Sequence, residues 1–411
     1  MSMIDTIKGQ SLTSLEMGVD SDQDRLRELA DGLISLSEND WQRVLEDRAQ
    51  FNYDLRVATY MAESRKWVQA NEKDISVGIV FAMWGEHTRL QQRTADNPNG
   101  ENSLLSKVRQ LRWLTQDSQV SWTLYAVDDG DPKDSAAVAE QIVEANNLED
   151  NVEVLRLTDV LGKHDEYPGL AGLSSADDSR KGGAIIHGCS QAVKDGNDAV
   201  IYTDADISVH LAQIGLLLAP FAAGEADVVI GDRKLPSSMV VKDALRWGPG
   251  VTILRFFQKR IGRYIFTNGI NDTQAPFKLY SAKALGSLLD KVQTYGFALD
   301  TEWLMLALKH DHKIASVPFA FVDSFAESAT KAQGAGTTWY SLLNGLAQQA
   351  QHHDVDRDKT LTEFVLTEIP DYHTIDAIIA ATPSDDLPLA DPQQASESDT
   401  KAVMDWVRSL G

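Results

Sequence analysis

The chain has 411 residues, of which 43% are hydrophobic, and its formal net charge at pH 7 is −23. This much apolar material excludes a disordered chain, and the acidity argues against DNA, RNA or an anionic membrane as the main partner. The single cysteine, Cys189, excludes an intrachain disulfide and a cysteine-based zinc site. No signal-peptide pattern opens the chain and no apolar run reaches the roughly 20 residues that span a bilayer, so we expect a cytoplasmic protein without stable membrane insertion.

The first 74 residues are predicted to form a helical N-terminal extension. Leu26, Leu29 and Leu33 recur at helical spacing, and a second helical pattern runs from Trp41 to Tyr60. The polar stretch at 37–40 indicates a turn between two helices. Such helices pack on the main domain or on a partner chain, which leaves a homodimer open.

From Ile75 onward, short β-branched runs alternate with helical patterns. The predicted strands cover 75–83, 122–127, 152–157, 199–203 and 228–230. The predicted helices between them cover 103–114, 135–145, 182–193 and 211–222. This alternation predicts an α/β fold with a mostly parallel, Rossmann-like sheet flanked by helices. Ligands of such sheets bind beyond the carboxyl ends of the strands.

The alternation weakens after the fifth predicted strand. Helical patterns follow at 245–266, 282–292 and 301–309, while 383–400 has the acidic, Pro- and Ser-rich composition of a linker or tail, ahead of a short helix at 403–410. We therefore expect a main domain over 75–332 and a helical C-terminal extension with an acidic tail over 333–411.

Pairs of acidic residues follow two of the predicted strands. Asp128 and Asp129 precede Gly130, a pattern that in isolation favours a plain turn. Asp204 and Asp206 are more informative, because alternate residues of an extended segment point the same way. Two converging carboxylates suit Mg²⁺ or Mn²⁺ shared with a phosphate-bearing ligand, although a solvated turn explains the same pattern.

A basic pair beside two glycines opens the predicted helix at 182–193. Arg180 and Lys181 supply positive charge, and Gly182-Gly183 at a helix start allows a ligand to approach free backbone N–H groups. In so acidic a protein this arrangement indicates a diphosphate contact, while a turn before the helix is the simpler alternative.

In order along the chain, these motifs resemble those of the family 2 glycosyltransferases with a GT-A fold. The matching segments are Met83–Glu86, Val127–Gly130, Lys181–Ala184, Thr203–Asp206, Gly231–Arg233, Asp272–Leu279, Phe297–Glu302 and Val317–Phe319. The resemblance covers about 75–332, and its nearest branch is the dolichyl- and polyprenyl-phosphate glucosyl- or mannosyltransferases.

The resemblance implies a metal-dependent transfer of a sugar from a nucleotide-diphosphate sugar, such as a UDP- or GDP-sugar, to an acceptor hydroxyl or phosphate. Mn²⁺ or Mg²⁺ would bind Asp206 with help from Asp204. The residues implied in donor binding are Met83, Trp84, Glu86, Asp128, Asp129, Arg180, Lys181, Asp204 and Arg233. Packing is the alternative role for Trp84, and a salt bridge to Asp232 is the alternative for Arg233.

The family's acceptor region implies three candidates for a catalytic base, Asp300, Glu302 and Asp272, of which Asp300 is favoured. Helix capping is the alternative role for the first two, and a phosphate acceptor needs no base. The histidine pairs 310/312 and 352/353 are expected at the surface rather than on a metal. Two other classes stay open: a nucleotidyltransferase that makes nucleotide sugars, and a non-catalytic protein that binds them.

Overall fold

The computed structural model describes residues 7, 9, 11, 15–179, 181–242, 248–324 and 334–410. By compactness the chain divides into two units. The first unit comprises 1–242, 275–291 and 310–326, and the second comprises 243–274, 292–309 and 327–411. The domain limits expected from the sequence stay a prediction.

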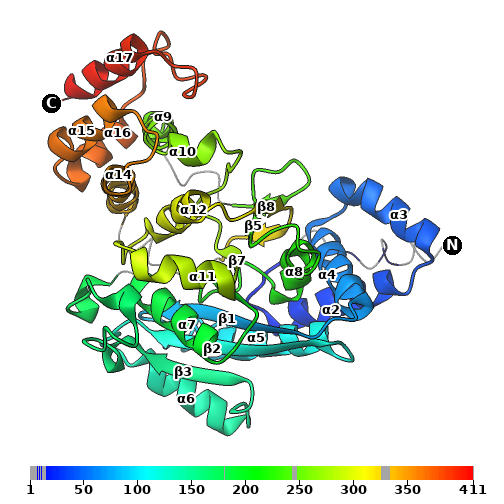
Figure 1. Ribbon diagram of the computed structural model, residues 1–411. Helices are drawn as coiled ribbons and strands as arrows, with labels where there is room; N and C mark the ends of the chain where they lie inside the picture. The colour runs from blue at the N-terminus through cyan, green and yellow to red at the C-terminus, as the bar shows by residue number, and fades with distance from the viewer. Residues whose placement is uncertain are drawn as a thin grey trace. The chain divides into compact units, whose positions relative to one another are not determined.

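A seven-stranded sheet forms the centre of the first unit, in the order β3-β2-β1-β4-β7-β5-β8 (Figure 1). Its strands are β1 (Ile75–Met83), β2 (Val120–Asp128), β3 (Val152–Arg156), β4 (Ala199–Thr203), β5 (Val228–Gly231), β7 (Phe277–Ser281) and β8 (Ile314–Val317). All neighbours are parallel except β7, which runs antiparallel to both β4 and β5. The predicted α/β fold with a mostly parallel sheet is therefore confirmed.

Helices cover both faces of this sheet. The helices of the first unit are α2 (Asp20–Ile34), α3 (Glu38–Asp47), α4 (Tyr53–Ala70), α5 (Ser103–Thr115), α6 (Ser135–Ala145), α7 (Gly182–Lys194), α8 (Ile214–Ala222) and α11 (Ala282–Leu288). Alternate residues of β1 serve opposite faces: Val77 and Ile79 join the main core, whereas Gly78 lies against Ala192 of α7. A Cβ at Gly78 would come within 2.7 Å of Ala192, so this glycine lets α7 pack closely.

The described part of the N-terminal segment contains three helices, α2, α3 and α4, whereas its periodicity predicts two. The 3-10 turn Arg48–Gln50 and the extended Asn52 separate α3 from α4. Ala49 and Tyr53 keep a four-residue spacing across this break, so the apolar pattern continues where the backbone does not. Most of the turn predicted at 37–40 is the start of α3, which Ser37 caps by accepting the Asp40 N–H.

A second, two-stranded sheet also belongs to the first unit. It pairs β6 (Met239–Val241) with β9 (Ala320–Val322) in parallel. Neither β6 nor the central β7 is among the strands expected from the sequence. Lys278 in the middle of β7 interrupts the apolar pattern, yet it is fully buried and its Nζ donates to the Ala275 carbonyl at 2.6 Å.

The described part of the second unit is helical. Its helices are α9 (Val251–Ile261), α10 (Arg263–Phe266), α12 (Leu299–Lys309), α14 (Ala335–His352), α15 (Lys359–Glu368), α16 (Tyr372–Ala380) and α17 (Glu397–Arg408). The single helix predicted over 245–266 is broken at Gly262, and its first residues lie outside the described part of the chain. The last residues of the predicted tail are helical, because α17 begins at Glu397, where Ser396 and Asp399 form a capping box.

Candidate functional site

The carboxyl ends of four strands bring most of the predicted site residues to one edge of the sheet. Met83 of β1 pairs with Asp128 of β2, and Phe81 of β1 pairs with Thr203 of β4. Because β7 is antiparallel to β4 and to β5, the end of β5 at Gly231 lies at the same edge. We call residues 84–89, 129–131, 204–208 and 232–234, which follow these ends, together with Glu101 and Lys181, the rim.

Asp129 connects the end of β2 to the start of α7. Its N–H donates to the Met83 carbonyl at 2.9 Å, and its carboxylate accepts the Ser179 hydroxyl and the Lys181 N–H, the latter at 2.7 Å. Burial raises the pKa of Asp129 to about 6. Since its carboxylate accepts the Lys181 N–H, Asp129 fixes the backbone from which the Lys181 side chain extends.

Asp128 shapes the turn beside it. Its Oδ1 accepts the N–H groups of Gly130 at 2.9 Å and Asp131 at 3.1 Å, and burial raises its pKa. Within the described part of the chain its buried Oδ2 has no hydrogen-bond partner. Asp128 therefore combines the turn role that its Asp-Asp-Gly context suggests with one acceptor oxygen that remains available.

Asp204 and Asp206 lie close together in the loop after β4, but their charges are met differently. The Lys181 ammonium pairs with Asp204 Oδ1, whereas Asp206 Oδ1 accepts the Ser208 N–H at 3.0 Å. Burial and the neighbouring Asp204 carboxylate raise the pKa of Asp206. Burial acts in the same direction on Asp204, but Lys181 outweighs it and the pKa of Asp204 is lowered.

Lys107 of α5 supports this loop and was not anticipated from the sequence. It is fully buried, and its Nζ donates to the carbonyl oxygens of Asp204, at 3.0 Å, and Asp206. Burial lowers its pKa to about 8 in spite of the two nearby carboxylates. One turn further along α5, Gln110 Oε1 accepts the Leu211 N–H at 2.8 Å. Two side chains of one helix thus hold both ends of the Asp204–Leu211 segment.

The loop after β1 adds a second group of charges. Arg89 Nε lies 3.3 Å from Glu86 Oε2 and 3.5 Å from Glu101 Oε2. Burial raises the pKa of Glu86 to about 7, with Arg89 opposing and Asp206 adding to the shift. Burial also raises the pKa of Glu101. Neither Arg89 nor Glu101 was singled out in the sequence, because the stretch between Trp84 and Ser103 has no helix or strand periodicity.

Trp84 and Arg233 complete the rim. Trp84 follows β1 directly and is 53% exposed, so packing, the alternative role considered for it, does not explain its presence. Arg233 stacks over the Phe321 ring at 5.4 Å and contributes to lowering the pKa of Asp204. Arg180, which was also predicted to bind the donor, lies outside the described residues.

The three predicted catalytic acids belong to the second unit. Among them, Glu302 makes several contacts that hold the fold of this unit. Its carboxylate accepts the N–H groups of Gln293 and Thr294 at 3.0 Å and lies 2.8 Å from His353 Nε2. His353 is buried, so the expectation that it lies at the surface is wrong. Asp272 is also buried, whereas Asp300 is half-buried in the first turn of α12.

The rim offers two carboxylates, rather than a complete ligand set, to a metal ion. In the described part of the chain no group of three or more His, Cys, Asp or Glu side chains is arranged to hold one. Mg²⁺ and Mn²⁺ sites commonly combine one or two carboxylates with phosphate oxygens of the substrate. Asp204 already attracts a cation, the Lys181 ammonium, and so the pair fits a divalent ion shared with a phosphate-bearing ligand.

Comparison with known families gives a match over part of the chain. The model of glycosyl transferase family 2 matches residues 161–289, which include α7, β4, β5 and β7. The match to this family spans about a third of the chain. This match supports, over these residues, the family resemblance that the motifs indicated.

Individual relatives are more distant. Glycosyltransferase AglD of Haloferax volcanii is 26% identical over 168 residues, which is 38% of this chain and 26% of that protein's own length. Among solved structures, glucosyl-3-phosphoglycerate synthase of Mycobacterium tuberculosis is 14% identical, with a TM-score of 0.46, over 71% of this chain and 84% of that one. Mannosyl-3-phosphoglycerate synthase of Rubrobacter xylanophilus is also 14% identical, with a TM-score of 0.46, over 76% of this chain and 83% of that one. No helix within the described ranges is long and apolar enough to cross a membrane.

Proposed function

We propose that this protein transfers a sugar from a nucleotide-diphosphate sugar to an acceptor. One observation carries the proposal: the ends of β1, β4 and β5 and the start of α7 bring together an exposed aromatic ring, two neighbouring carboxylates and two cationic side chains, and α7, β4 and β5 lie in the segment that matches family 2. An aromatic face suits a nucleotide base, and cations beside a carboxylate pair suit a diphosphate with its metal ion.

Each part of the donor then has a partner on the rim. The base stacks on Trp84, beside Glu86, and the diphosphate lies against Lys181 and Arg233. Asp204 and Asp206 hold Mn²⁺ or Mg²⁺, which, when bound, neutralises the negative charge that develops on the departing nucleoside diphosphate. Asp129 acts indirectly, because it fixes the backbone from which Lys181 extends.

We retain Asp300 as the proposed base for an acceptor hydroxyl, with Asp272 as the second candidate. Glu302 is the weakest of the three, since its carboxylate already accepts two N–H groups and contacts His353. In this scheme the base takes the proton of the acceptor hydroxyl as its oxygen attacks the sugar's anomeric carbon. The acceptor is a hydroxyl or a phosphate, and only the hydroxyl requires a base.

A ligand screen followed by an activity assay tests the proposal. UDP, GDP and their sugars are each added with and without Mn²⁺, and thermal unfolding is followed. Saturation with the correct nucleotide and Mn²⁺ should raise Tm by about 5 °C. The matching nucleotide sugar should then be cleaved slowly to free sugar and nucleoside diphosphate in the absence of acceptor. Stabilisation without any cleavage would favour the non-catalytic alternative, and no stabilisation by any nucleotide would refute the proposal.

A further inference from the structure

The ion pair between Lys181 and Asp204 occupies an oxygen that a metal ion would need. The Lys181 ammonium contacts Asp204 Oδ1, and the two side chains are 27% and 37% exposed. A ligand from solution can therefore reach both partners. An ammonium group and a divalent cation repel each other, so the two compete for the Asp204 carboxylate.

Hydrogen bonds fix the backbone of Lys181, whereas its ammonium is carried by a flexible side chain. Its φ of +81° is unusual for a residue with a Cβ. The Asp129 carboxylate holds its N–H, and its carbonyl accepts the Ile185 N–H at 3.1 Å in the first turn of α7. The four-carbon stem of a lysine adopts many rotamers. The ammonium can consequently leave Asp204 without any rearrangement of the main chain.

Lys107 shows what a permanent support of the same loop looks like. It is fully buried and donates to the main-chain carbonyl oxygens of Asp204 and Asp206, not to their carboxylates. Its ammonium therefore leaves the carboxylate oxygens available to a ligand. Lys181, by contrast, approaches the carboxylate itself from a partly exposed position.

We infer that the Lys181 ammonium is a displaceable counter-ion of Asp204, which moves to the donor's diphosphate when a divalent cation takes its place. This inference rests on the proposed function. In the free protein the ammonium neutralises Asp204 and opposes metal binding. A nucleoside diphosphate gives the ammonium a new partner, so nucleotide and metal each strengthen the binding of the other.

The test compares Mn²⁺ binding in the wild type and in Lys181→Met, which keeps the length of the side chain and the strained backbone but removes the charge. Mn²⁺ affinity is measured by calorimetric titration, alone and in the presence of UDP or GDP. We expect Lys181→Met to bind Mn²⁺ alone about tenfold more tightly than the wild type does. The factor by which nucleotide strengthens Mn²⁺ binding should fall by about tenfold, within the range usual for coupled sites.

Two further variants control for charge and for the site. Lys194→Met removes the same charge from the exposed other end of α7 and should leave Mn²⁺ affinity unchanged. Asp206→Asn should weaken Mn²⁺ binding whether or not Lys181 is present. If Lys181→Met does not fold, as judged by circular dichroism, Lys181→Gln replaces it.

The outcomes separate this inference from the proposed function. Mn²⁺ affinity in Lys181→Met that is equal to or below that of the wild type, without nucleotide, overturns the counter-ion role. If the wild type binds neither UDP nor GDP with Mn²⁺, the proposed function fails instead. The comparison made with Mn²⁺ alone still decides the counter-ion role in that case.

Discussion

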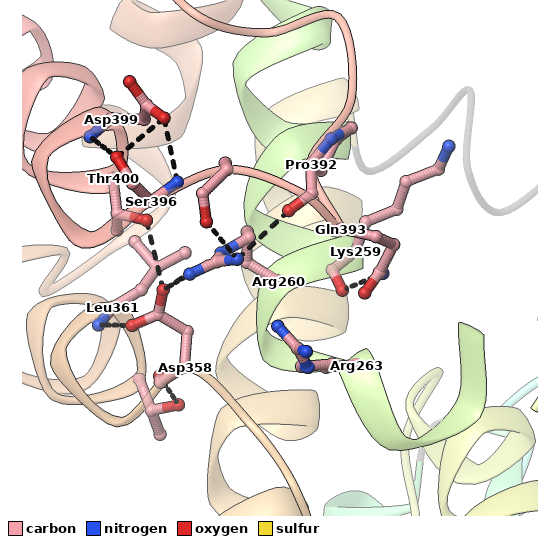
Figure 2. Close-up of polar contacts among 12 residues, drawn as sticks. Lys259, Arg260, Arg263, Asp358, Leu361, Pro392, Gln393, Ser396, Asp399 and Thr400 are labelled. Carbon is pink, nitrogen blue, oxygen red and sulfur yellow. Dashed lines mark hydrogen bonds and ion pairs between the residues drawn. The ribbon is translucent and has the colours of Figure 1, made fainter. Parts of the chain in front are cut away.

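Arg260 and Asp358 in the second unit form a cluster of buried charge that the chain completes by itself, whereas the rim of the first unit does not complete its own. Figure 2 shows Arg260 reaching Asp358 and the Pro392 carbonyl. The guanidinium donates to Asp358 Oδ2 at 2.6 and 3.0 Å and to the carbonyls of Pro392, at 3.2 Å, and Ala395, at 2.8 Å. The carboxylate also accepts Thr400 and caps α15 through the Leu361 N–H.

The rim has charges of both signs but a different balance. Glu86, Glu101 and Asp206 all have a raised pKa, chiefly because of burial. Lys107 donates its hydrogen bonds to main-chain carbonyl oxygens rather than to the carboxylates of these acids. The ionised forms of these acids therefore destabilise the folded protein, because neighbouring groups of the chain do not fully offset the loss of hydration. A bound cation would reduce this destabilisation.

The comparison teaches how to tell a structural charge cluster from a functional one. Both contain buried acids and bases, so burial alone does not discriminate between them. The distinguishing property is completeness: the Arg260–Asp358 cluster joins three segments of one unit, while the rim leaves acids that favour an added cation. The predictions that follow test this difference from both sides.

The largest expected effect is loss of activity in Asp206→Asn. Removal of one of the two proposed metal ligands should lower the rate of sugar transfer or donor hydrolysis about a thousandfold, equivalent to about 4 kcal/mol. Thermal unfolding without ligand should be unchanged or slightly improved at pH 7, because the lost charge has a raised pKa. A large drop in Tm would instead show that Asp206 stabilises the fold, as the Arg260–Asp358 cluster does.

For Asp358→Ala we expect the opposite result, a loss of stability without a loss of nucleotide binding. Loss of this carboxylate leaves the buried Arg260 guanidinium without its counter-ion and should lower the free energy of unfolding by about 3 kcal/mol. Nucleotide affinity, measured on the folded protein, should stay at the wild-type value. Asp356→Ala is the matched control, because Asp356 pairs with Arg263 at 3.1 Å on the exposed surface and its loss should cost under about 1 kcal/mol. Equal losses in the two variants would contradict the comparison.

The sequence predicted the framework of the rim well, because that framework is local. Buried β-branched runs mark these strands, and residues of the rim follow them directly, as Trp84 follows Met83 and Asp204 follows Thr203. The parallel order then requires that these ends meet at one edge. The motifs also led to the family whose model matches residues 161–289.

What the sequence did not reveal depends on contacts between distant residues. The sequence pattern suggests that Lys107 is a solvent-facing charge of an amphipathic helix. In the structure it donates hydrogen bonds to the carbonyl oxygens of Asp204 and Asp206, 97 and 99 residues away. Glu302 reads as an acid at a helix start, but His353, which is 51 residues away, is its partner. Periodicity describes which face of an element is apolar and does not show which polar group lies opposite a buried charge.

A smaller effect is expected for Lys107→Met, which tests whether the rim needs its buried support. Without the bonds to the Asp204 and Asp206 carbonyls, the carboxylates should lose their common orientation, and Mn²⁺ affinity should fall about tenfold to a hundredfold, as for other residues that orient metal ligands. Nucleotide binding without Mn²⁺ should change much less. Lys73→Met is the control, since the exposed Lys73 also donates to a main-chain carbonyl, that of Ala222, at 2.6 Å. A loss of Mn²⁺ affinity no greater than in the control would remove Lys107 from the positioning role.

The smallest effect concerns the pH dependence of stability in Glu86→Gln. The pKa of Glu86 rises from 4.5 to about 7 on folding, so the folded state binds this proton more tightly than the unfolded state does. The wild type should therefore lose stability between pH 4.5 and pH 7, whereas the variant has no proton to release at this position. At pH 8 Glu86→Gln should be more stable than the wild type by about 2 kcal/mol, and near pH 4.5 the difference should disappear. Urea unfolding at both pH values measures it, with the exposed Glu144→Gln as control. A wild type that is more stable than Glu86→Gln at pH 8 would show that Arg89 fully compensates Glu86, and the rim would then resemble the closed cluster of the second unit.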